Sequence, residues 1–123
     1  MDNNLDNKLD NNCIFCKIIK GEVPSEKVYE TDDVLVFKSI EPVTKMHDLV
    51  IPKKHISNLQ EMNDEDKKYY LEKIYDAIQE VARIENIAES GYRVVTNVLE
   101  DGGQSVMHIH FHVLGGEKLQ DNL

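Results

Sequence analysis

The chain has 123 residues, which suits one domain built around a single hydrophobic core. Its residues are 41% hydrophobic and 30% charged, as in globular proteins and unlike disordered chains. The formal net charge of −9 argues against a protein that binds polymeric nucleic acid, because such proteins need basic surface to neutralise phosphates. No apolar run approaches the roughly 18 residues that would cross a membrane, so no membrane partner is expected.

The N-terminal segment is rich in Asn and Asp and lacks both the basic start and the apolar middle of a secretory signal. We therefore predict a flexible tail over residues 1–12 of a cytoplasmic protein. The ordered domain is expected over residues 13–118, followed by a C-terminal tail over residues 119–123. Apolar residues at helical spacing predict a short first helix over residues 13–20, ended by Gly21.

Three strands are expected next. Two β-rich runs, 28–31 and 34–37, are separated by two aspartates, which predicts a hairpin. A third run, 47–51, is closed by a proline. In this run Asp48 follows His47, and strand alternation turns the two side chains to opposite faces.

A long helix and two more strands complete the expected elements. Asn63 is suited to cap a helix that runs to about Ile84. The expected apolar stripe of this helix consists of Leu71, Ile74, Ile78 and Val81. Strands are predicted over residues 92–97 and 106–114, with a glycine turn between them. Two helices and five short strands with mostly tight connections predict the α+β class with an antiparallel sheet.

The last predicted strand carries three histidines at alternate positions, His108, His110 and His112. On a strand these side chains share one face, while the apolar residues between them bury the other. Imidazole binds metals, titrates near neutral pH and can attack a substrate, so such a row predicts a functional site. The preceding turn, Gly102-Gly103-Gln104-Ser105, is suited to approach a phosphate with backbone N–H groups.

The chain has two cysteines, Cys13 and Cys16. Their two-residue gap suits a redox pair or half of a zinc site, and two buried thiols without a metal are a third interpretation. A redox pair is disfavoured because the βαβ context of a thioredoxin-like fold is absent. A zinc held by all three strand histidines is also disfavoured, since neighbours about 7 Å apart cannot all reach one ion.

A seven-residue segment resembles the signature of the histidine triad (HIT) family of nucleotide hydrolases and transferases: His108-Ile109-His110-Phe111-His112-Val113-Leu114. Further segments with the same resemblance are 13–25, 47–55, 91–95, 102–105 and 114–116, within a region that covers residues 13–118. The last of these, Leu-Gly-Gly, resembles the branch of histidine-triad nucleotide-binding proteins that act on adenosine phosphoramidates. The resemblance implies a HIT-like fold, a five-stranded antiparallel sheet with one short N-terminal helix and one long helix, assembled as a homodimer.

The resemblance also implies catalytic roles. His110 corresponds to the histidine that attacks the α-phosphorus of a nucleotide and forms a nucleotidyl-histidine, which water then cleaves. His112 and Ser105 match positions near the phosphate and the leaving group, where Ser105 would help to protonate a departing amine. His47 matches a buried histidine beneath the triad that fixes ring orientation or relays a proton.

Nucleotide binding is implied for further residues. The backbone N–H groups expected to stabilise charge on the phosphate oxygens are those of Gly103, Gln104 and Ser105. Asn97 matches a contact to the phosphate region, and Ile40 matches the wall that holds base and ribose. This chain has Ser39 where the family usually has Asp, so a single hydroxyl replaces a carboxylate that binds both ribose hydroxyls.

A structural zinc is implied as a cofactor, because family members with the Cys-x-x-Cys pair bind one. Its four ligands would be Cys13, Cys16, His55 and His108. The metal would tie the N-terminal helix to the sheet, and its binding energy would add to the folding energy.

We therefore predict an enzyme, a purine nucleoside phosphoramidate hydrolase that cleaves at the α-phosphorus. Its small-molecule ligand would be a purine nucleotide of the AMP or GMP type. A dinucleoside polyphosphate hydrolase is an alternative within the family. An alternative of another class is a zinc-stabilised nucleotide-binding or protein-interaction module with little turnover.

Overall fold

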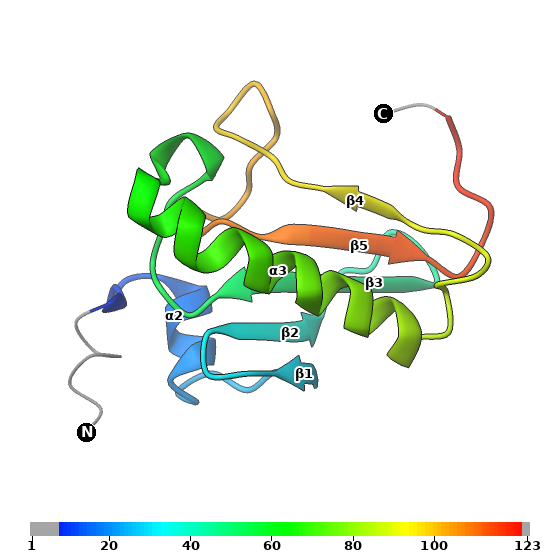
Figure 1. Ribbon diagram of the computed structural model, residues 1–123, viewed down its shortest axis with the longest axis horizontal. Helices are drawn as coiled ribbons and strands as arrows, with labels where there is room; N and C mark the ends of the chain where they lie inside the picture. The colour runs from blue at the N-terminus through cyan, green and yellow to red at the C-terminus, as the bar shows by residue number, and fades with distance from the viewer. Residues whose placement is uncertain (1–7, 122–123) are drawn as a thin grey trace.

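The computed structural model describes residues 8–121, so residues 1–7 and 122–123 of the two predicted tails lie outside the described residues (Figure 1). In chain order the elements are α2 (Ile14–Ile19), β1 (Lys27–Glu30), β2 (Val34–Lys38), β3 (Met46–Pro52), a 3₁₀ helix (Leu59–Glu61), α3 (Asp64–Ile84), β4 (Arg93–Val95) and β5 (Phe111–Gly115). The strands form one antiparallel sheet in the order β1-β2-β3-β5-β4. The predicted α+β class and five-stranded sheet are therefore confirmed.

The long helix α3 lies across one face of the sheet (Figure 1). The side chain of Asn63 caps its first turn by accepting a hydrogen bond from the backbone N–H of Asp66 at 2.7 Å. The apolar side chains that the helix buries are Tyr70, Ile74, Ala77, Ile78, Val81 and Ala82. The prediction for Leu71 was wrong, because the buried stripe begins one position earlier, at Tyr70, and leaves Leu71 37% exposed.

The short helix α2 packs on the opposite face of the sheet. Cys13 precedes the helix and caps it, since its Sγ accepts a hydrogen bond from the backbone N–H of Cys16 at 3.2 Å. The helix buries its apolar side chains with four residues of β2 and β3: Leu35, Phe37, Leu49 and Ile51. The same face carries His47 and His112, because His47 alternates with Leu49 on β3 and His112 lies opposite Leu49 on β5.

Strand β5 is shorter than the sequence pattern predicts. The pattern gives a strand over residues 106–114, whereas pairing with β3 starts at Phe111. Strand β3 ends at Pro52, which has no N–H to donate, and the chain before Phe111 leaves the sheet. There the backbone N–H of Ile109 donates to the carbonyl oxygen of Ile56 at 2.7 Å instead. His108 therefore belongs to an irregular segment that runs up to the strand.

Strand β4 is also shorter than predicted, because a side-chain hydrogen bond follows its last backbone pair. Its pairing with β5 ends at Val95, and the next side chain, Thr96, donates its hydroxyl hydrogen to the carbonyl oxygen of His110 at 2.8 Å.

At the N-terminal end of the described residues, Leu9 packs against the residues buried by α2. The predicted domain limits stay predictions. Within residues 8–121, no helix has the length and apolar character to span a membrane.

Candidate active site and metal centre

His110 is 4% exposed, and one ring nitrogen fixes its orientation. Its Nδ1 lies 2.8 Å from the carbonyl oxygen of His108. A carbonyl oxygen can only accept, so the proton of the neutral ring lies on Nδ1. Burial lowers the pKa of His110, partly opposed by this hydrogen bond, and the ring is neutral at physiological pH. Nε2 therefore carries a free lone pair, as a nucleophile requires.

His47 and His112 form a directed chain of hydrogen bonds. The backbone N–H of Val43 donates to Nδ1 of His47 at 3.1 Å, so a neutral His47 carries its proton on Nε2. This Nε2 lies 2.8 Å from Nδ1 of His112 and donates to it. His112 must then hold its own proton on Nε2, where it can donate to a ligand.

Burial and the neighbouring imidazoles keep these rings uncharged. Burial, followed by the nearby His110 and His47, lowers the pKa of His112 to about 4. Burial, followed by His110, also lowers the pKa of His47. The ring centroids of His110 and His112 lie 5.0 Å apart. Two neutral rings with opposite hydrogen-bonding character therefore lie side by side, one with a lone pair and one with an N–H.

Sequence analysis missed Phe15, which touches both parts of the site. Its ring packs edge-on against His110, with centroids 5.1 Å apart, and against His108 at 5.9 Å. It also packs against Phe37 of β2 at 5.4 Å. The available signal was its place between the two cysteines. Phe15 thus restricts the rotation of both histidine rings from the α2 side.

The loop from Asn97 to Ser105 is closed by side-chain amides. Nδ2 of Asn97 donates to the carbonyl oxygen of Gly102 at 2.7 Å. The buried Gln104 accepts from the backbone N–H of Leu99 with Oε1 and donates from Nε2 to the carbonyl oxygen of Ser57. Its amide therefore ties the loop to the segment that contains Ser57.

Two of the three predicted phosphate donors are engaged inside this loop. The backbone N–H of Gly103 donates to the carbonyl oxygen of Glu100, and that of Gln104 donates to Leu99, each at 3.0 Å. Among residues 8–121, the N–H of Ser105 has no such acceptor. Ser105 is therefore the member of the three that is free to meet a phosphate, and nucleotide contacts by the other two stay predictions.

The predicted base and ribose residues lie on an open loop. The hydroxyl of Ser39 accepts a hydrogen bond from the backbone N–H of Glu41 at 3.2 Å, and the N–H of Ser39 donates to the carbonyl oxygen of His47 at 3.0 Å. Ile40 is 95% exposed. This side chain would gain burial only from a ligand seated against it.

The predicted metal ligands converge in space. The ligand atoms of Cys13, Cys16, His55 and His108 all lie within 4.8 Å of one another. Nδ1 of His108 lies 3.3 Å from Sγ of Cys13 and 3.5 Å from Sγ of Cys16, and Nδ1 of His55 lies 3.5 Å from the latter. Zinc bonds of about 2.3 Å to sulfur and 2.1 Å to nitrogen, at tetrahedral angles, place the two donors roughly 3.6 Å apart. The donor set and its spacing therefore fit a tetrahedral zinc ion.

The charge state of the histidine ligand His108 favours metal binding, whereas that of Cys16 requires the loss of a proton. Burial lowers the pKa of His108 to about 4, so its ring is in the neutral form that coordinates metals. Burial raises the pKa of the Cys16 thiol to about 12, and a metal must displace that proton. Metal uptake at this cluster is therefore coupled to proton release.

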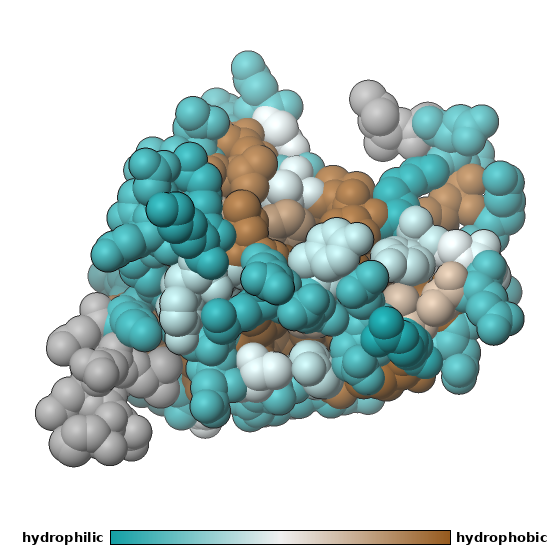
Figure 2. Space-filling model, viewed as in Figure 1, coloured by the Kyte–Doolittle hydropathy of each residue, from teal (hydrophilic) through white to brown (hydrophobic). Residues whose placement is uncertain are grey.

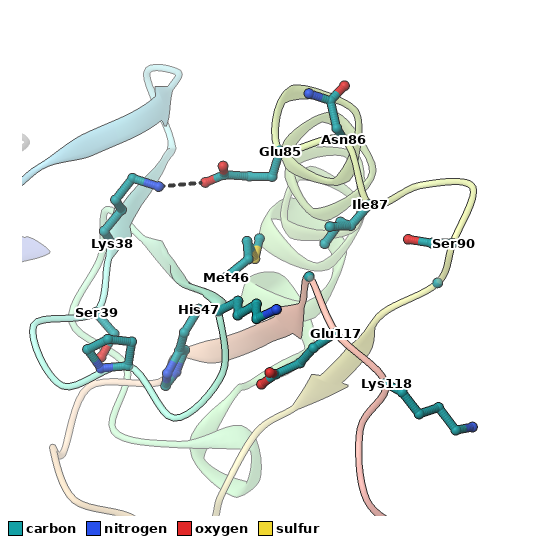
Figure 3. Close-up of a pocket in the computed structure, with 14 residues that line it drawn as sticks. Lys38, Ser39, Met46, His47, Glu85, Asn86, Ile87, Ser90, Glu117 and Lys118 are labelled. Atoms are coloured by element: carbon teal, nitrogen blue, oxygen red, sulfur yellow. Dashed lines mark hydrogen bonds and ion pairs between the residues drawn. The ribbon is translucent and has the colours of Figure 1, made fainter.

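A separate cavity of about 670 Å³ opens between the ends of β2 and β3 and the C-terminal end of α3 (Figure 3). Nζ of Lys38 and a carboxylate oxygen of Glu85 face each other across its rim at 3.0 Å. His47 lines this cavity, whereas His110 and His112 do not. The cavity therefore meets the histidine cluster through His47 alone.

Comparison with known protein families finds the HIT domain over residues 20–119. The chain belongs to the HIT domain family. The resemblance carried by its histidine segment is thereby confirmed.

Two curated relatives and one solved structure illustrate the similarity. "Protein hit" of Bacillus subtilis is 47% identical over 105 residues, which cover 84% of this chain and 70% of that protein. The purine nucleoside phosphoramidase of Escherichia coli is 41% identical over 106 residues, 86% of this chain and 88% of that protein. A HIT family hydrolase from Clostridium thermocellum superposes with a TM-score of 0.90 at 43% identity, covering 94% of this chain and 99% of that one.

Proposed function

We propose that this protein hydrolyses purine nucleoside phosphoramidates at the α-phosphorus. The observation that carries the proposal is the pair of neutral rings, His110 with a lone pair on Nε2 and His112 with a proton on Nε2, at a centroid distance of 5.0 Å. The 41% identity to the purine nucleoside phosphoramidase of Escherichia coli supports the substrate class.

In the first step, Nε2 of His110 forms a bond to phosphorus while the P–N bond to the amine breaks with its electron pair. The hydrogen bond from Nδ1 to the carbonyl oxygen of His108 stabilises the positive charge that develops on the His110 ring. The Nε2–H of His112 donates to a phosphoryl oxygen, and the hydroxyl of Ser105 passes a proton to the departing amine. In the second step, the oxygen of a water molecule forms a bond to phosphorus, the bond between phosphorus and Nε2 breaks with its electron pair returning to His110, and a proton of the water restores the Ser105 hydroxyl. The nucleoside monophosphate is then released.

The nucleoside would lie against the open loop that carries Ser39 and Ile40. Burial of Ile40 by a purine base would remove an almost fully exposed apolar side chain from water. Asn97, Gly103 and Gln104 are retained as predicted contacts of the phosphate region. Their internal hydrogen bonds make them a rigid support for Ser105.

We also propose that the Cys13–Cys16–His55–His108 cluster holds a structural zinc ion. Thiolate and imidazole ligands favour zinc over hard cations such as magnesium. The ion would supply a fixed link between α2 and the segment before β5. No step of the reaction uses it.

A homodimer is proposed from the surface around β4. This strand is at the edge of the sheet and exposes Val94, and α3 exposes Leu71 and Tyr75. Figure 2 shows apolar surface beside the hydrophilic outer face of α3. Pairing of two such edges would satisfy the free strand groups and cover these side chains.

The decisive experiment compares hydrolysis of adenosine 5′-phosphoramidate and diadenosine tetraphosphate at equal concentration, with His110→Asn as the inactive control. Asn retains a hydrogen-bond donor but has no ring nitrogen to attack phosphorus. We expect faster P–N cleavage by the wild type, a loss of at least about 10³-fold in kcat for the variant, and little change in AMP affinity.

Other outcomes would change the proposal. Faster cleavage of the tetraphosphate would favour the polyphosphate hydrolase. Tight AMP binding with no turnover of either compound would favour the nucleotide-binding module. Equal rates for wild type and His110→Asn would remove His110 as the nucleophile.

A further inference from the structure

The segment immediately before α2 is folded onto the proposed metal cluster. The carbonyl oxygen of Lys8 accepts a hydrogen bond from the backbone N–H of His55 at 2.7 Å. The backbone N–H of Asp10 points at Sγ of Cys16 at 3.4 Å, and the carbonyl oxygen of Asp10 accepts from the N–H of Cys13 at 3.2 Å. Residues that the sequence assigns to a flexible tail thus contact three of the four ligand residues from outside.

The orientation of the two histidine ligands leaves the Nε2–H group of each ring in need of a hydrogen-bond acceptor. Both rings turn Nδ1 toward the thiols, so in each ring the proton lies on Nε2, on the far side. Nε2 of His108 lies 3.0 Å from the carbonyl oxygen of Pro52, which accepts this proton. The corresponding partner of His55 is a side chain, because Oδ2 of Asp10 lies 3.8 Å from its Nε2.

The carboxylate of Asp10 is held so that one oxygen is left for His55. Its Oδ1 accepts a hydrogen bond from the backbone N–H of Asn12 at 2.8 Å, which closes a turn. The other oxygen, Oδ2, faces His55. A hydrogen bond of about 2.9 Å requires Oδ2 and Nε2 to approach by roughly 1 Å, which the half-exposed side chain permits by a small rotation.

We propose that Asp10 is a positioning residue of the metal site, whose carboxylate accepts the Nε2–H of His55. This inference rests on the proposed zinc site. The carboxylate fixes the ring with Nδ1 toward the metal. The N–H of the same residue stabilises the thiolate of Cys16. Asp10 therefore contacts one ligand of each chemical type, His55 through its carboxylate and Cys16 through its backbone N–H.

The test separates the carboxylate from the turn. Asp10→Asn keeps an oxygen for the turn to Asn12 but removes the carboxylate, whereas Asp10→Glu keeps a carboxylate on a longer stem that does not fit the turn. Asp121→Asn is the matched control, since it removes one exposed carboxylate near the other end of the chain (Figure 1). Zinc affinity of each full-length protein is measured by competition with a chromogenic chelator. The visible spectrum of the Co²⁺-substituted proteins reports whether tetrahedral S₂N₂ coordination is kept.

We expect Asp10→Asn to bind zinc roughly 10- to 100-fold more weakly than the wild type with a Co²⁺ spectrum that remains tetrahedral. Asp10→Glu should lie closer to the wild type, and Asp121→Asn should be indistinguishable from it. The inference is overturned if Asp10→Asn binds zinc as well as the wild type or at least as well as Asp10→Glu. If the wild-type protein binds no zinc, the proposed metal site itself is wrong. This result is distinct from a failure of the Asp10 inference, which is judged by comparing the variants with a wild type that binds zinc.

Discussion

The position of one proton in each ring gives His110 and His112 different chemical roles. The carbonyl oxygen behind His110 holds the proton on Nδ1, and the Val43–His47 chain behind His112 holds it on Nε2. Both assignments follow from backbone groups that can only accept or only donate. The main chain thus decides which ring can attack and which can donate.

The pH dependence of kcat/KM tests these charge states. Attack requires a neutral His110, whose folded-state pKa is below the ordinary value of 6.5. We therefore expect kcat/KM to stay flat on lowering the pH through 6.5 and to fall only at lower pH. The measurement is hydrolysis of an adenosine phosphoramidate between pH 4 and pH 9, with the stability of the enzyme checked at each pH. An acid limb centred at or above pH 6.5 would contradict the proposed state of His110.

Replacement of Ser39 by Asp is expected to improve substrate affinity. Asp at this position can place two oxygens on the two ribose hydroxyls, while one of them still accepts from the N–H of Glu41 as the serine hydroxyl does. We predict that Ser39→Asp lowers KM for adenosine phosphoramidate by roughly 5- to 150-fold, equivalent to about 1–3 kcal/mol. Ser39→Asn, of the same size without the charge, is the control. An unchanged or raised KM for Ser39→Asp would remove Ser39 from the ribose site.

Sequence patterns predict these residues unevenly. Alternation draws attention to the three histidines, but the expectation that all three share one face of a strand was wrong: His112 lies on β5, whereas the other two precede it. The brace formed by Gln104 and the contacts of Phe15 depend on where distant chain segments meet, and no local period encodes that. Asp10 lies in a polar run typical of a tail, and only the folded position of His55 gives it a partner.

At the scale of elements, helix α3 and the strand cores could be predicted, whereas strand ends could not. Asn63 and the apolar spacing fix α3 to within one residue at its start. Strand ends depend on contacts with other segments: β5 begins at Phe111, opposite Val50, because the backbone N–H of Ile109 pairs with Ile56 instead of with β3. The irregular segment that results lets His108 turn toward the cysteines while His110 stays beside His112.

A buried acid lies where β3 meets the C-terminal end of α3. Asp48 is fully buried, and its carboxylate oxygens have no hydrogen-bond donor among residues 8–121. Burial, followed by the neighbouring carboxyl of Glu85, raises the pKa of Asp48 to about 8. Contact with Asp48, followed by the ammonium group of Lys38, lowers the pKa of Glu85 despite its burial. The folded protein therefore keeps Asp48 protonated at neutral pH, with Glu85 as the anion beside Lys38 (Figure 3).

Replacement of this acid should stabilise the fold in a pH-dependent way. The folded state holds a proton on Asp48 that the unfolded chain, with a pKa near 3.8, has released, so the contribution of Asp48 to stability falls as pH rises from about 4 to about 8. Asp48→Asn has no such proton to hold and still offers Glu85 a donor. We expect a higher Tm for Asp48→Asn, by an amount that is larger at pH 8 than at pH 5.

Scanning calorimetry at pH 5 and pH 8 measures this difference. The control is Asp66→Asn, which changes another buried aspartate but one that is paired with Nζ of Lys54 at 2.6 Å. That variant should lower Tm, because it leaves a lysine without its partner. A Tm shift of Asp48→Asn that is equal at the two pH values would contradict the protonated state of Asp48.

For the molecule as a whole, the metal cluster joins segments that are far apart in the sequence. Cys13 and Cys16 come from the start of the domain, His55 follows β3, and His108 precedes β5, so four ligands bring together chain positions up to 95 residues apart. Helix α2 has six residues and buries a small apolar face. An isolated helix of this length is unstable in water, so its position depends on packing and on this cluster.

Removal of zinc is therefore expected to loosen the α2 side of the domain. We predict that the double variant Cys13→Ser/Cys16→Ser binds no zinc and melts roughly 10–20 °C below the zinc-loaded wild type, as a site filled at about 1,000 times its Kd adds about 4 kcal/mol. His110→Ala, which leaves all four ligands in place, should retain one zinc per chain. The metal content of freshly purified protein and Tm with and without a strong chelator provide the measurement.

Hydrogen exchange tests where the loosening occurs. Because α3 and its side of the sheet provide none of the zinc ligands, removal of zinc should raise exchange in α2 and around His55 while the centre of α3 stays protected. Equal protection of α2 with and without zinc would show that packing alone holds this helix.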